Sequence, residues 1–339
     1  MGRPHRLHSI LSIGDHYPGR PRSVAGLYDE VIGQCVLAEK LGYEAFFTAE
    51  HHFHEYGAVP DPAVLLTAMA AKTSRIRLGT AISVLPFRNP LTVAESYAMV
   101  DMLSGGRLVL GVGSGYLAHE FEGFGVLPQE KRDRFDEALE VLRLALSGEP
   151  VNFDGRYHKI DGVALNVAPV QRPVPIHVAV LRPEAAWHVG KAGNSIFCVP
   201  YASVAGMDDV GTLFRSFAEG RAEAGLDAAG DAAAFAFHTF VAETDEEAQE
   251  MAAEAFELYV ATRLYARRQT WDDIMASGLS LMGSVETVAE KLRMLAGWGL
   301  GHVLTLQNFG GLAPDAVERS MRLFAEEALP RALAAGPRC

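Results

Sequence analysis

Short apolar segments alternate with helix-like segments along almost the whole chain, and this alternation restricts the possible folds more than any other feature. Segments whose apolar residues recur at helical spacing, such as 24–41 and 129–147, separate the apolar runs. Apolar strands joined by helices form parallel sheets that the helices cover. About eight such units in 339 residues favour an α/β fold of the (β/α)8 TIM barrel type over an open doubly wound sheet. The predicted strands are residues 7–13, 44–48, 76–85, 107–112, 174–180, 194–199, 233–242 and 301–306.

The alternation continues without a break in composition, so we predict a single domain over residues 1–339. Two segments interrupt its rhythm. Residues 150–169 contain the pair Asp154-Gly155, which is typical of a tight turn and predicts an inserted hairpin. Residues 265–282 show no clear period.

Charge and cysteine content narrow the classes of partner. The formal net charge is −12 and no run is rich in Lys or Arg, which argues against nucleic acid and acidic membranes as partners. Cys35, Cys198 and Cys339 lie far apart, which argues against a disulfide framework and suits a reducing compartment. No apolar stretch approaches the roughly 20 residues of a membrane helix, and no signal peptide is recognisable. We therefore expect a soluble, cytoplasmic protein.

The densest group of titratable side chains, residues 50–55 (EHHFHE), directly follows the predicted strand 44–48. Active sites of α/β proteins lie at the carboxyl ends of strands, so this position favours function. The histidine spacing and order are wrong for a zincin helix, although a metal-dependent hydrolase with distant ligands remains an alternative. We favour His51 as a general base or hydrogen-bond donor. His52 and His54 are interpreted as locally satisfied, supporting residues.

Two glycine-containing segments follow or form strands. The sequence Gly111–Gly115 (GVGSG) ends the strand at 107–112, where glycines allow a ligand to approach the backbone. It lacks the third glycine of a dinucleotide-binding turn, so a tight strand-to-loop turn is an equal alternative. Residues 79–83 (GTAIS) place small side chains in an earlier strand, and barrel packing alone would explain them.

Taken together, these segments resemble one family. EHHF after the second strand, GTAISVLP with a second proline four residues later, and SGGRLVLGVGSGY around the fourth strand occur in this order and spacing. The chain resembles the bacterial luciferase-like family of flavin-dependent monooxygenases, an LLM class of oxidoreductases, most strongly over residues 40–147. The resemblance implies a TIM barrel with a flavin lying across its C-terminal mouth.

The resemblance also implies the residues of the site. The first histidine of the pair, His51, would be catalytic, with Glu50 before it to orient it. A non-prolyl cis peptide between Ala81 and Ile82, followed by Ser83, would support the flavin ring. Phosphate contacts would come from the loops after the fourth and fifth strands; in the second loop Arg182 would replace the small hydroxyl residues common in the family. These loop residues are Gly113, Ser114, Gly115, Tyr116, Leu181 and Arg182.

The resemblance implies a two-component monooxygenase. Reduced FMN would come from a separate flavin reductase and react with O2 to a C4a-peroxyflavin, which oxygenates a small organic substrate. An oxidoreductase of the same fold that uses the deazaflavin F420 is the first alternative. A non-catalytic partner subunit is the second, against which the presence of His51 argues. Gly113 stands where some luciferases have a reactive cysteine, which does not favour light emission.

Two further features follow from the resemblance. Residues 265–282 fall where the family carries a mobile lid, and Arg267, Arg268 and Trp271 could close over the flavin; an ordered surface loop is the alternative. A homodimer would form through the helices after the second and third strands. The candidate contact residues in the first of these helices are Leu65, Leu66 and Met69.

Overall fold

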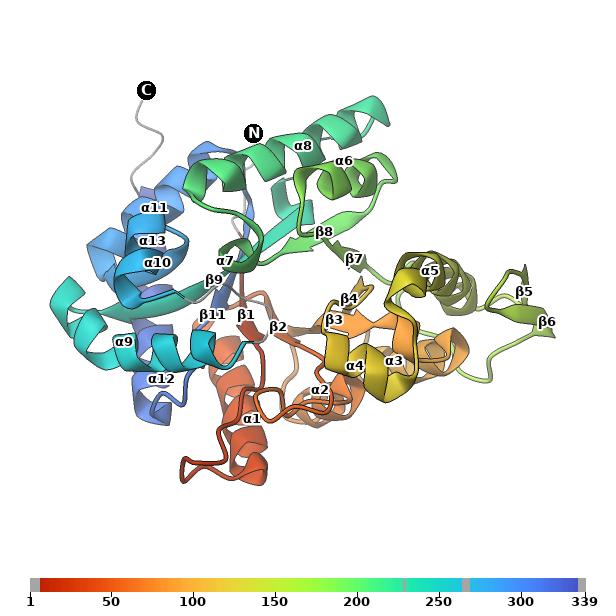
Figure 1. The fold of residues 1–339 in the computed structure, drawn as a ribbon, viewed down its shortest axis with the longest axis horizontal. Helices are drawn as coiled ribbons and strands as arrows, with labels where there is room; N and C mark the ends of the chain where they lie inside the picture. Colours follow the sequence, from red (N-terminus) through yellow and green to blue (C-terminus); the bar gives the residue numbers. More distant parts are fainter. Residues whose placement is uncertain (1–6, 228–229, 264–268, 335–339) are drawn as a thin grey trace.

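The computed structural model describes residues 7–227, 230–263 and 269–334, and in this part of the chain eight parallel strands close into a barrel (Figure 1). Each strand of the ring is hydrogen-bonded to its two neighbours, and β11 returns to β1. The predicted TIM barrel is therefore confirmed. The ring runs through β1 (Leu7–Ser12), β2 (Ala45–Thr48), β3 (Arg77–Val84), β4 (Leu108–Gly113), β7 (Ile176–Ala179), β8 (Ser195–Cys198), β9 (Ala233–Ala242) and β11 (His302–Leu306).

Helices surround the barrel and follow its strands in sequence (Figure 1). The helices are α1 (Val24–Leu41), α2 (Pro62–Ala70), α3 (Pro90–Ser104), α4 (Ala118–Phe124), α5 (Lys131–Ser147), α6 (Pro183–Lys191), α7 (Pro200–Ser203), α8 (Met207–Glu223), α9 (Asp245–Ala261), α10 (Trp271–Ser277), α11 (Val285–Gly297), α12 (Pro314–Leu323) and α13 (Leu329–Ala334). A π-helical turn at Phe324–Ala328 lies between the last two helices, α12 and α13.

Local sequence signals set where helices begin and end. The Asp61 side chain accepts a hydrogen bond from the backbone N–H of Ala63 and Pro62 occupies the first position, so α2 begins there. Gly42 takes a left-handed conformation with φ of 81° and ends α1. Thr244 accepts from the N–H of Glu247 at the start of α9. Each of these signals is visible in the sequence.

The two irregular segments have different outcomes. The predicted hairpin is confirmed as antiparallel strands β5 (Val151–Asp154) and β6 (Lys159–Val163), which project beyond α5 (Figure 1). The segment 265–282 contains α10 and the start of β10 (Ser280–Ser284), neither of which we predicted. β10 pairs with the C-terminal half of β9, from Ser280 opposite His238 to Ser284 opposite Ala242.

Glycines inside the barrel make room for aromatic rings. A Cβ atom on Gly79 would lie 2.5 Å from the Phe47 ring, and one on Gly111 would lie 2.5 Å from the Phe197 ring. The two rings themselves contact edge to face, with centroids 5.1 Å apart. Thr80 then ties β3 to β4, because its hydroxyl donates to the Gly111 carbonyl at 2.6 Å. Barrel packing thus explains the glycines of both strands.

The three residues predicted to contact a second copy are buried inside the protein, so this part of the prediction is wrong. Leu66 and Met69 are fully buried and Leu65 is nearly so, because this side of α2 packs against the barrel. The apolar side chains that α2 and the adjacent α3 leave exposed are Val64, Met99, Met102 and Leu103. Any contact with a second copy through these helices would therefore use that set.

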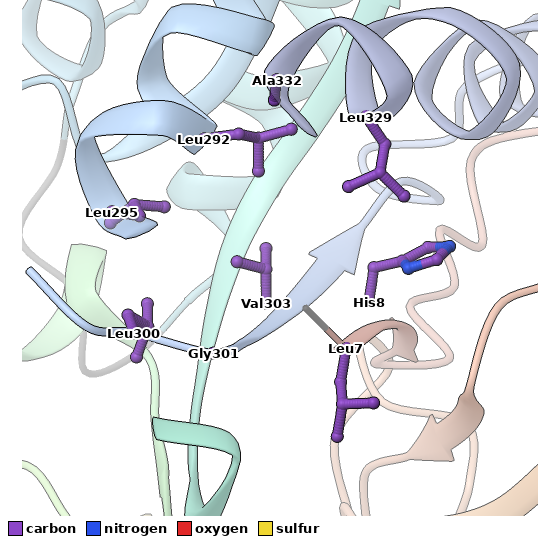
Figure 2. Close-up of a pocket in the computed structure, with 9 residues that line it drawn as sticks. All are labelled: Leu7, His8, Leu292, Leu295, Leu300, Gly301, Val303, Leu329 and Ala332. Carbon is purple, nitrogen blue, oxygen red and sulfur yellow. The ribbon is translucent and has the colours of Figure 1, made fainter. Parts of the chain in front are cut away.

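A small cavity lies at the opposite end of the barrel from the strand ends that carry the predicted site. It opens between the starts of β1 and β11 and the helices α11 and α13 (Figure 2). It offers a water-sized molecule about 20 Å³, so it is a packing gap and not a ligand site. Its lining is Leu7, His8, Leu292, Leu295, Leu300, Gly301, Val303, Leu329 and Ala332.

A helix that spans a membrane must be both long and apolar. Among the residues that the structure describes, none of the helices has both the length and the apolar character needed to span a membrane.

Candidate active site

Glu50 lies directly after β2 and connects this strand to β3. Its backbone N–H donates to the Ile82 carbonyl at 3.1 Å, and its buried carboxylate accepts from the Ser83 hydroxyl at 2.8 Å and the Val84 N–H at 3.3 Å. The other carboxylate oxygen lies 3.0 Å from Nε2 of His52. Glu50 therefore fixes the position of the His52 ring and of the end of β3. The prediction that it orients His51 is wrong, because adjacent residues in this extended loop point to different sides.

His51 faces a different carboxylate, that of Glu120. Its Nδ1 lies 3.4 Å from Oε1 of Glu120, and its ring packs edge to face on Tyr56, with centroids 5.4 Å apart. Burial lowers the pKa of His51. The hydrogen bond that its ring makes to the Glu120 carboxylate opposes that effect only in part. The imidazole is therefore neutral near pH 7. A carboxylate at Nδ1 favours the tautomer that carries its proton there, which leaves the Nε2 lone pair available.

Glu120 is the residue that sequence reasoning missed. It lies in the first turn of α4, is 2% exposed, and also accepts the backbone N–H of His52 at 2.9 Å. One carboxylate thus fixes both the His51 ring and the following peptide. The available signal was an acidic residue shortly after the GVGSG turn. Its use required knowing that the short α4 folds back over the loop that follows β2.

His52 and His54 have the supporting roles that we expected. The His52 ring packs edge to face on Phe124 at a centroid distance of 4.7 Å, in addition to its contact with Glu50. His54 packs on Tyr56, with centroids 4.2 Å apart. Phe53 between them has a positive φ of 57° and is 63% exposed. The loop thus directs alternate side chains toward the protein and toward solvent.

The peptide bond between Ala81 and Ile82 is cis, as the resemblance implies. The pairing of β3 with β4 shifts register between Thr80 and Ser83, at the same place. Ile82 also explains Gly113, since a Cβ atom there would lie 2.1 Å from Cδ1 of Ile82. The end of β4 therefore packs closely on the cis segment, and a side chain at position 113 would require the Ile82 side chain to move.

The loops after β4 and β7 lie side by side, because these strands are neighbours in the ring. Gly115 has a positive φ of 74°, a conformation that glycine adopts without strain, and Ser114 is partly exposed. Tyr116, Leu181 and Arg182 are exposed beside the same end of the barrel. The structure thus places the predicted phosphate-loop residues at the same end as His51; their contacts with a cofactor stay a prediction.

The predicted lid is only partly within the described residues. Arg267 and Arg268 lie outside them. Trp271 is 6% exposed in α10, and its backbone N–H donates to a carboxylate oxygen of Glu257 at 3.1 Å. The Trp271 side chain belongs to the packed core, and its part in a lid stays a prediction.

A buried arginine, which sequence reasoning did not predict, completes this end of the barrel. Arg263 follows α9 and is 4% exposed. Its Cζ atom lies 4.3 Å from the ring centroid of Tyr56 and 3.8 Å from that of Tyr259. Its positive charge also contributes to lowering the pKa of His51.

A metal site would require His, Cys, Asp or Glu side chains grouped around one point. Within residues 7–227, 230–263 and 269–334, no three or more His, Cys, Asp and Glu side chains are grouped in a way that could hold a metal ion. Glu50 and Glu120 instead bind histidine rings and backbone N–H groups.

Comparison with known proteins identifies the family to which the chain belongs. The luciferase-like monooxygenase family profile matches residues 13–302, and the chain belongs to this family. The crystal structure of monooxygenase RslO1 from Streptomyces bottropensis is 30% identical, with a TM-score of 0.89, and the match covers 96% of this chain and 99% of that one.

Two curated relatives represent different branches. Limonene 1,2-monooxygenase of Rhodococcus erythropolis is 28% identical over 86% of this chain and 78% of its own length. The F420-dependent glucose-6-phosphate dehydrogenase of Nocardia farcinica is 33% identical over 58% of this chain and 60% of its own length. The curated relatives with 33 to 37% identity are matched over only 51 to 60% of their length.

Proposed function

We propose that the protein is a flavin-dependent monooxygenase that uses reduced FMN and O2 to oxygenate a small organic substrate. The observation that carries the proposal is the neutral, buried His51, paired with Glu120 and placed at the same barrel end as the cis Ala81–Ile82 segment. Membership of the luciferase-like monooxygenase family and the similarity to two proteins named as monooxygenases support it.

The residues at the strand ends fit a flavin. Glycine at position 113 leaves room for the Ile82 side chain, and Gly115 gives the loop after β4 a left-handed turn. Ser114 can donate to a phosphate, and Arg182 carries a positive charge at the next loop. Ala81 and Ile82 are partly exposed and would support the ring. When bound, reduced flavin supplies two electrons, so that one atom of O2 enters the substrate and the other leaves as water.

Each polar residue of the site has a separate task in this proposal. His51 accepts or donates a proton at Nε2. Glu120 holds the proton on Nδ1 and so keeps Nε2 in the accepting form. Glu50 fixes the position of Ser83 and, through its backbone N–H, of the Ile82 carbonyl. Closely packed aromatic side chains around His52 limit the access of water to this network.

The proposal includes two protein partners. In this proposal, reduced FMN comes from a separate flavin reductase. A second copy of the chain docks through the exposed apolar side chains of α2 and α3.

Stopped-flow mixing tests the activity. The purified protein is titrated anaerobically with reduced FMN and then mixed with O2. We expect tight binding of reduced FMN and O2 consumption in its presence, and His51→Ala to lower substrate oxygenation by about 10²-fold or more. The proposal is falsified if the wild-type protein neither binds reduced FMN nor consumes O2 with it.

A second candidate function is hydride transfer with the deazaflavin F420, favoured by the 33% identity to an F420-dependent dehydrogenase. Parallel titrations with FMN and F420 separate the two candidates, since only one should bind in the micromolar range. A non-catalytic partner subunit is the remaining alternative. Turnover that is unchanged in His51→Ala would support it.

A further inference from the structure

Phe53, two residues after His51, has a backbone conformation that does not suit its side chain. Its φ of 57° lies in the left-handed region, and in the described part of the chain every other residue with a positive φ is a glycine. A bulky side chain is strained there, whereas glycine or asparagine adopts the conformation readily. Strain of this kind next to a functional residue calls for a reason, and the contacts of the ring provide one.

Burial of the Phe53 ring does not explain the choice of residue. Phe53 is 63% exposed, so only a small part of its apolar surface is removed from water. The ring instead lies against α4, with its centroid 5.0 Å from that of Phe124. A Cβ atom on Gly123 would lie 2.4 Å from Cδ2 and Cε2 of Phe53. The ring therefore occupies the place that a side chain at position 123 would take.

Gly123 is the second residue that local preference does not explain. It lies inside α4, where alanine would favour the helix more than glycine does. Its φ is not positive, so the backbone does not require glycine. The missing side chain is used by the Phe53 ring. A strained phenylalanine and a helix glycine, distant in the sequence, thus break local rules for the same contact, as residues near functional sites do.

The helix α4 depends on contacts of this kind for its position. It has only 7 residues and no side-chain hydrogen bond at its N-cap, and helices so short are not stable alone. Phe121 anchors one side of α4, with its ring centroid 4.9 Å from that of Phe87. Gly123 is two residues further and faces a different side, because residues two apart on a helix are not neighbours. Phe53 therefore holds a side of α4 that Phe121 does not.

The position of α4 matters because this helix carries Glu120. The Glu120 carboxylate accepts the backbone N–H of His52 at 2.9 Å and lies 3.4 Å from Nδ1 of His51. Nε2 of His119 lies 3.0 Å from the carbonyl oxygen of His52. These contacts join α4 to the loop after β2, the same two segments that Phe53 joins. Movement of α4 away from this loop would separate the carboxylate from the His51 ring.

We propose that Phe53 is a positioning residue, whose ring, seated against Gly123, holds α4 on the loop after β2 and so keeps Glu120 on His51. The inference rests on the proposed function, because that function makes His51 the group that accepts or donates the proton. Phe53 acts through Glu120 and not on the substrate. Its strained backbone is the cost of placing an aromatic ring at this point of the loop.

Hydrogen exchange of the His52 amide tests this role. The N–H donates to Glu120, so it exchanges when α4 leaves the loop. Phe53→Asn suits the left-handed conformation but has no ring, and we expect the His52 amide to exchange about tenfold faster than in the wild type. Phe53→Tyr keeps the ring and should restore the wild-type rate. Equal acceleration in both variants would overturn the proposal.

Gly123→Ala tests the same contact from the helix. Alanine favours helix formation, but its Cβ takes the place of the Phe53 ring, so we expect His52 exchange to become about tenfold faster here too. Gly33→Ala on α1 meets no atom within 4 Å and should leave the rate unchanged. Circular dichroism reports whether each variant is folded; if Phe53→Asn is not, Gly123→Ala decides. An unchanged rate in the folded variants would refute the role.

The pKa of His51 is a readout that a purely structural role would leave unchanged. It is measured by NMR on the full-length protein with labelled histidine rings, and the His51 signal is assigned by its loss in His51→Gln. Burial is the largest cause of the low pKa, so in Phe53→Asn and Gly123→Ala we expect the pKa to rise toward its ordinary value of about 6.5. A wild-type pKa in both variants would contradict the proposal.

The exchange and NMR measurements need neither flavin nor O2. A protein that shows the expected changes but does not consume O2 with reduced FMN therefore refutes only the monooxygenase function. A protein that consumes O2 normally, with His52 exchange and His51 pKa unchanged in the variants, refutes only the role of Phe53.

Discussion

Two adjacent histidines with different carboxylate partners define the site at the scale of single residues. His51 meets Glu120 on α4, and His52 meets Glu50 at the end of β2. The sequence alone predicted that the first histidine is functional and the second supporting. It could not assign the carboxylates, because Glu50 is next to His51 in the chain, while Glu120 is 69 residues away and belongs to a helix too short to have a recognisable period.

The two carboxylates should respond differently to removal of their charge. Glu120→Gln should change the pH dependence of the His51-dependent step, because an amide cannot hold the Nδ1 proton in the same way. Glu50→Gln should act mainly on folding, with a loss of about 1–3 kcal/mol, because the Ser83 and Val84 donors lose a charged acceptor. Activity measured across pH and unfolding in urea separate these effects. Equal pH profiles for both variants would contradict the assignment.

Buried histidines away from the site should make stability sensitive to acid. Burial lowers the pKa of His302 to about 4 and that of His177 to about 3, whereas an unfolded histidine has a pKa of about 6.5. Below pH 6.5 the unfolded chain therefore binds more protons, and stability falls with pH down to about pH 4, by up to about 3 kcal/mol for His302 alone.

Substitution of His302 provides the measurement. His302→Gln can keep a hydrogen bond to the Ser9 hydroxyl, which lies 2.9 Å from Nε2, but it does not titrate. Urea unfolding at pH 7 and pH 5 should show a smaller acid-induced loss of stability in the variant than in the wild type. A loss of the same size in both proteins would mean that His302 does not contribute.

At the scale of elements, the sequence predicted those with strong periods and missed the short ones. The strand 233–242 and the helix 24–41 occur as predicted, since each is long enough to show its pattern. β10 and α10 were missed because the sequence from 265 to 282 mixes polar and apolar residues without a clear period. α10 has only 7 residues, fewer than two helical turns. Their structure depends on packing against β9 and α9, which a local pattern does not contain.

The pairing of β3 with β4 should be a place where an added methyl group is costly. Gly111→Ala would bring a Cβ atom to 2.1 Å from the Thr80 carbonyl oxygen and 2.5 Å from the Phe197 ring, so we expect a loss of about 1–3 kcal/mol. Gly33→Ala on α1 is the matched control. It meets no atom within 4 Å, and alanine there should add up to about 1 kcal/mol of stability. Unfolding in urea compares the two, and similar effects would refute the packing explanation.

At the scale of the whole molecule, the number and order of strand–helix units were sufficient to predict a closed barrel. The resemblance added the location of the site, including the cis bond between Ala81 and Ile82. The sequence predicted least well which apolar helix side chains are exposed. Leu65, Leu66 and Met69 look like a contact surface in the sequence, yet a helix packed on a barrel turns such residues inward.

The proposed homodimer can be tested on the side chains that remain exposed. Met99 and Leu103 are 52% and 60% exposed, and their spacing of four residues puts them on one face of α3. We expect sedimentation velocity to show a dimer for the wild type and a monomer for the double variant Met99→Glu, Leu103→Glu. Leu333→Glu, at a 49% exposed position of α13, is the control and should remain dimeric. A monomeric wild type would refute the proposal.

The seam between β1 and β11 has a consequence for how the chain is made. Leu7 pairs with His302 and Ile10 with Thr305, so β1 is synthesised long before β11, the strand that covers its second edge. Throughout synthesis that edge presents unpaired N–H and C=O groups, which can pair with strands of other nascent chains. Contacts between such distant segments also slow folding. The barrel can close only once β11 has been made, so its yield in a cell should depend on how well the open edge of β1 is protected until then.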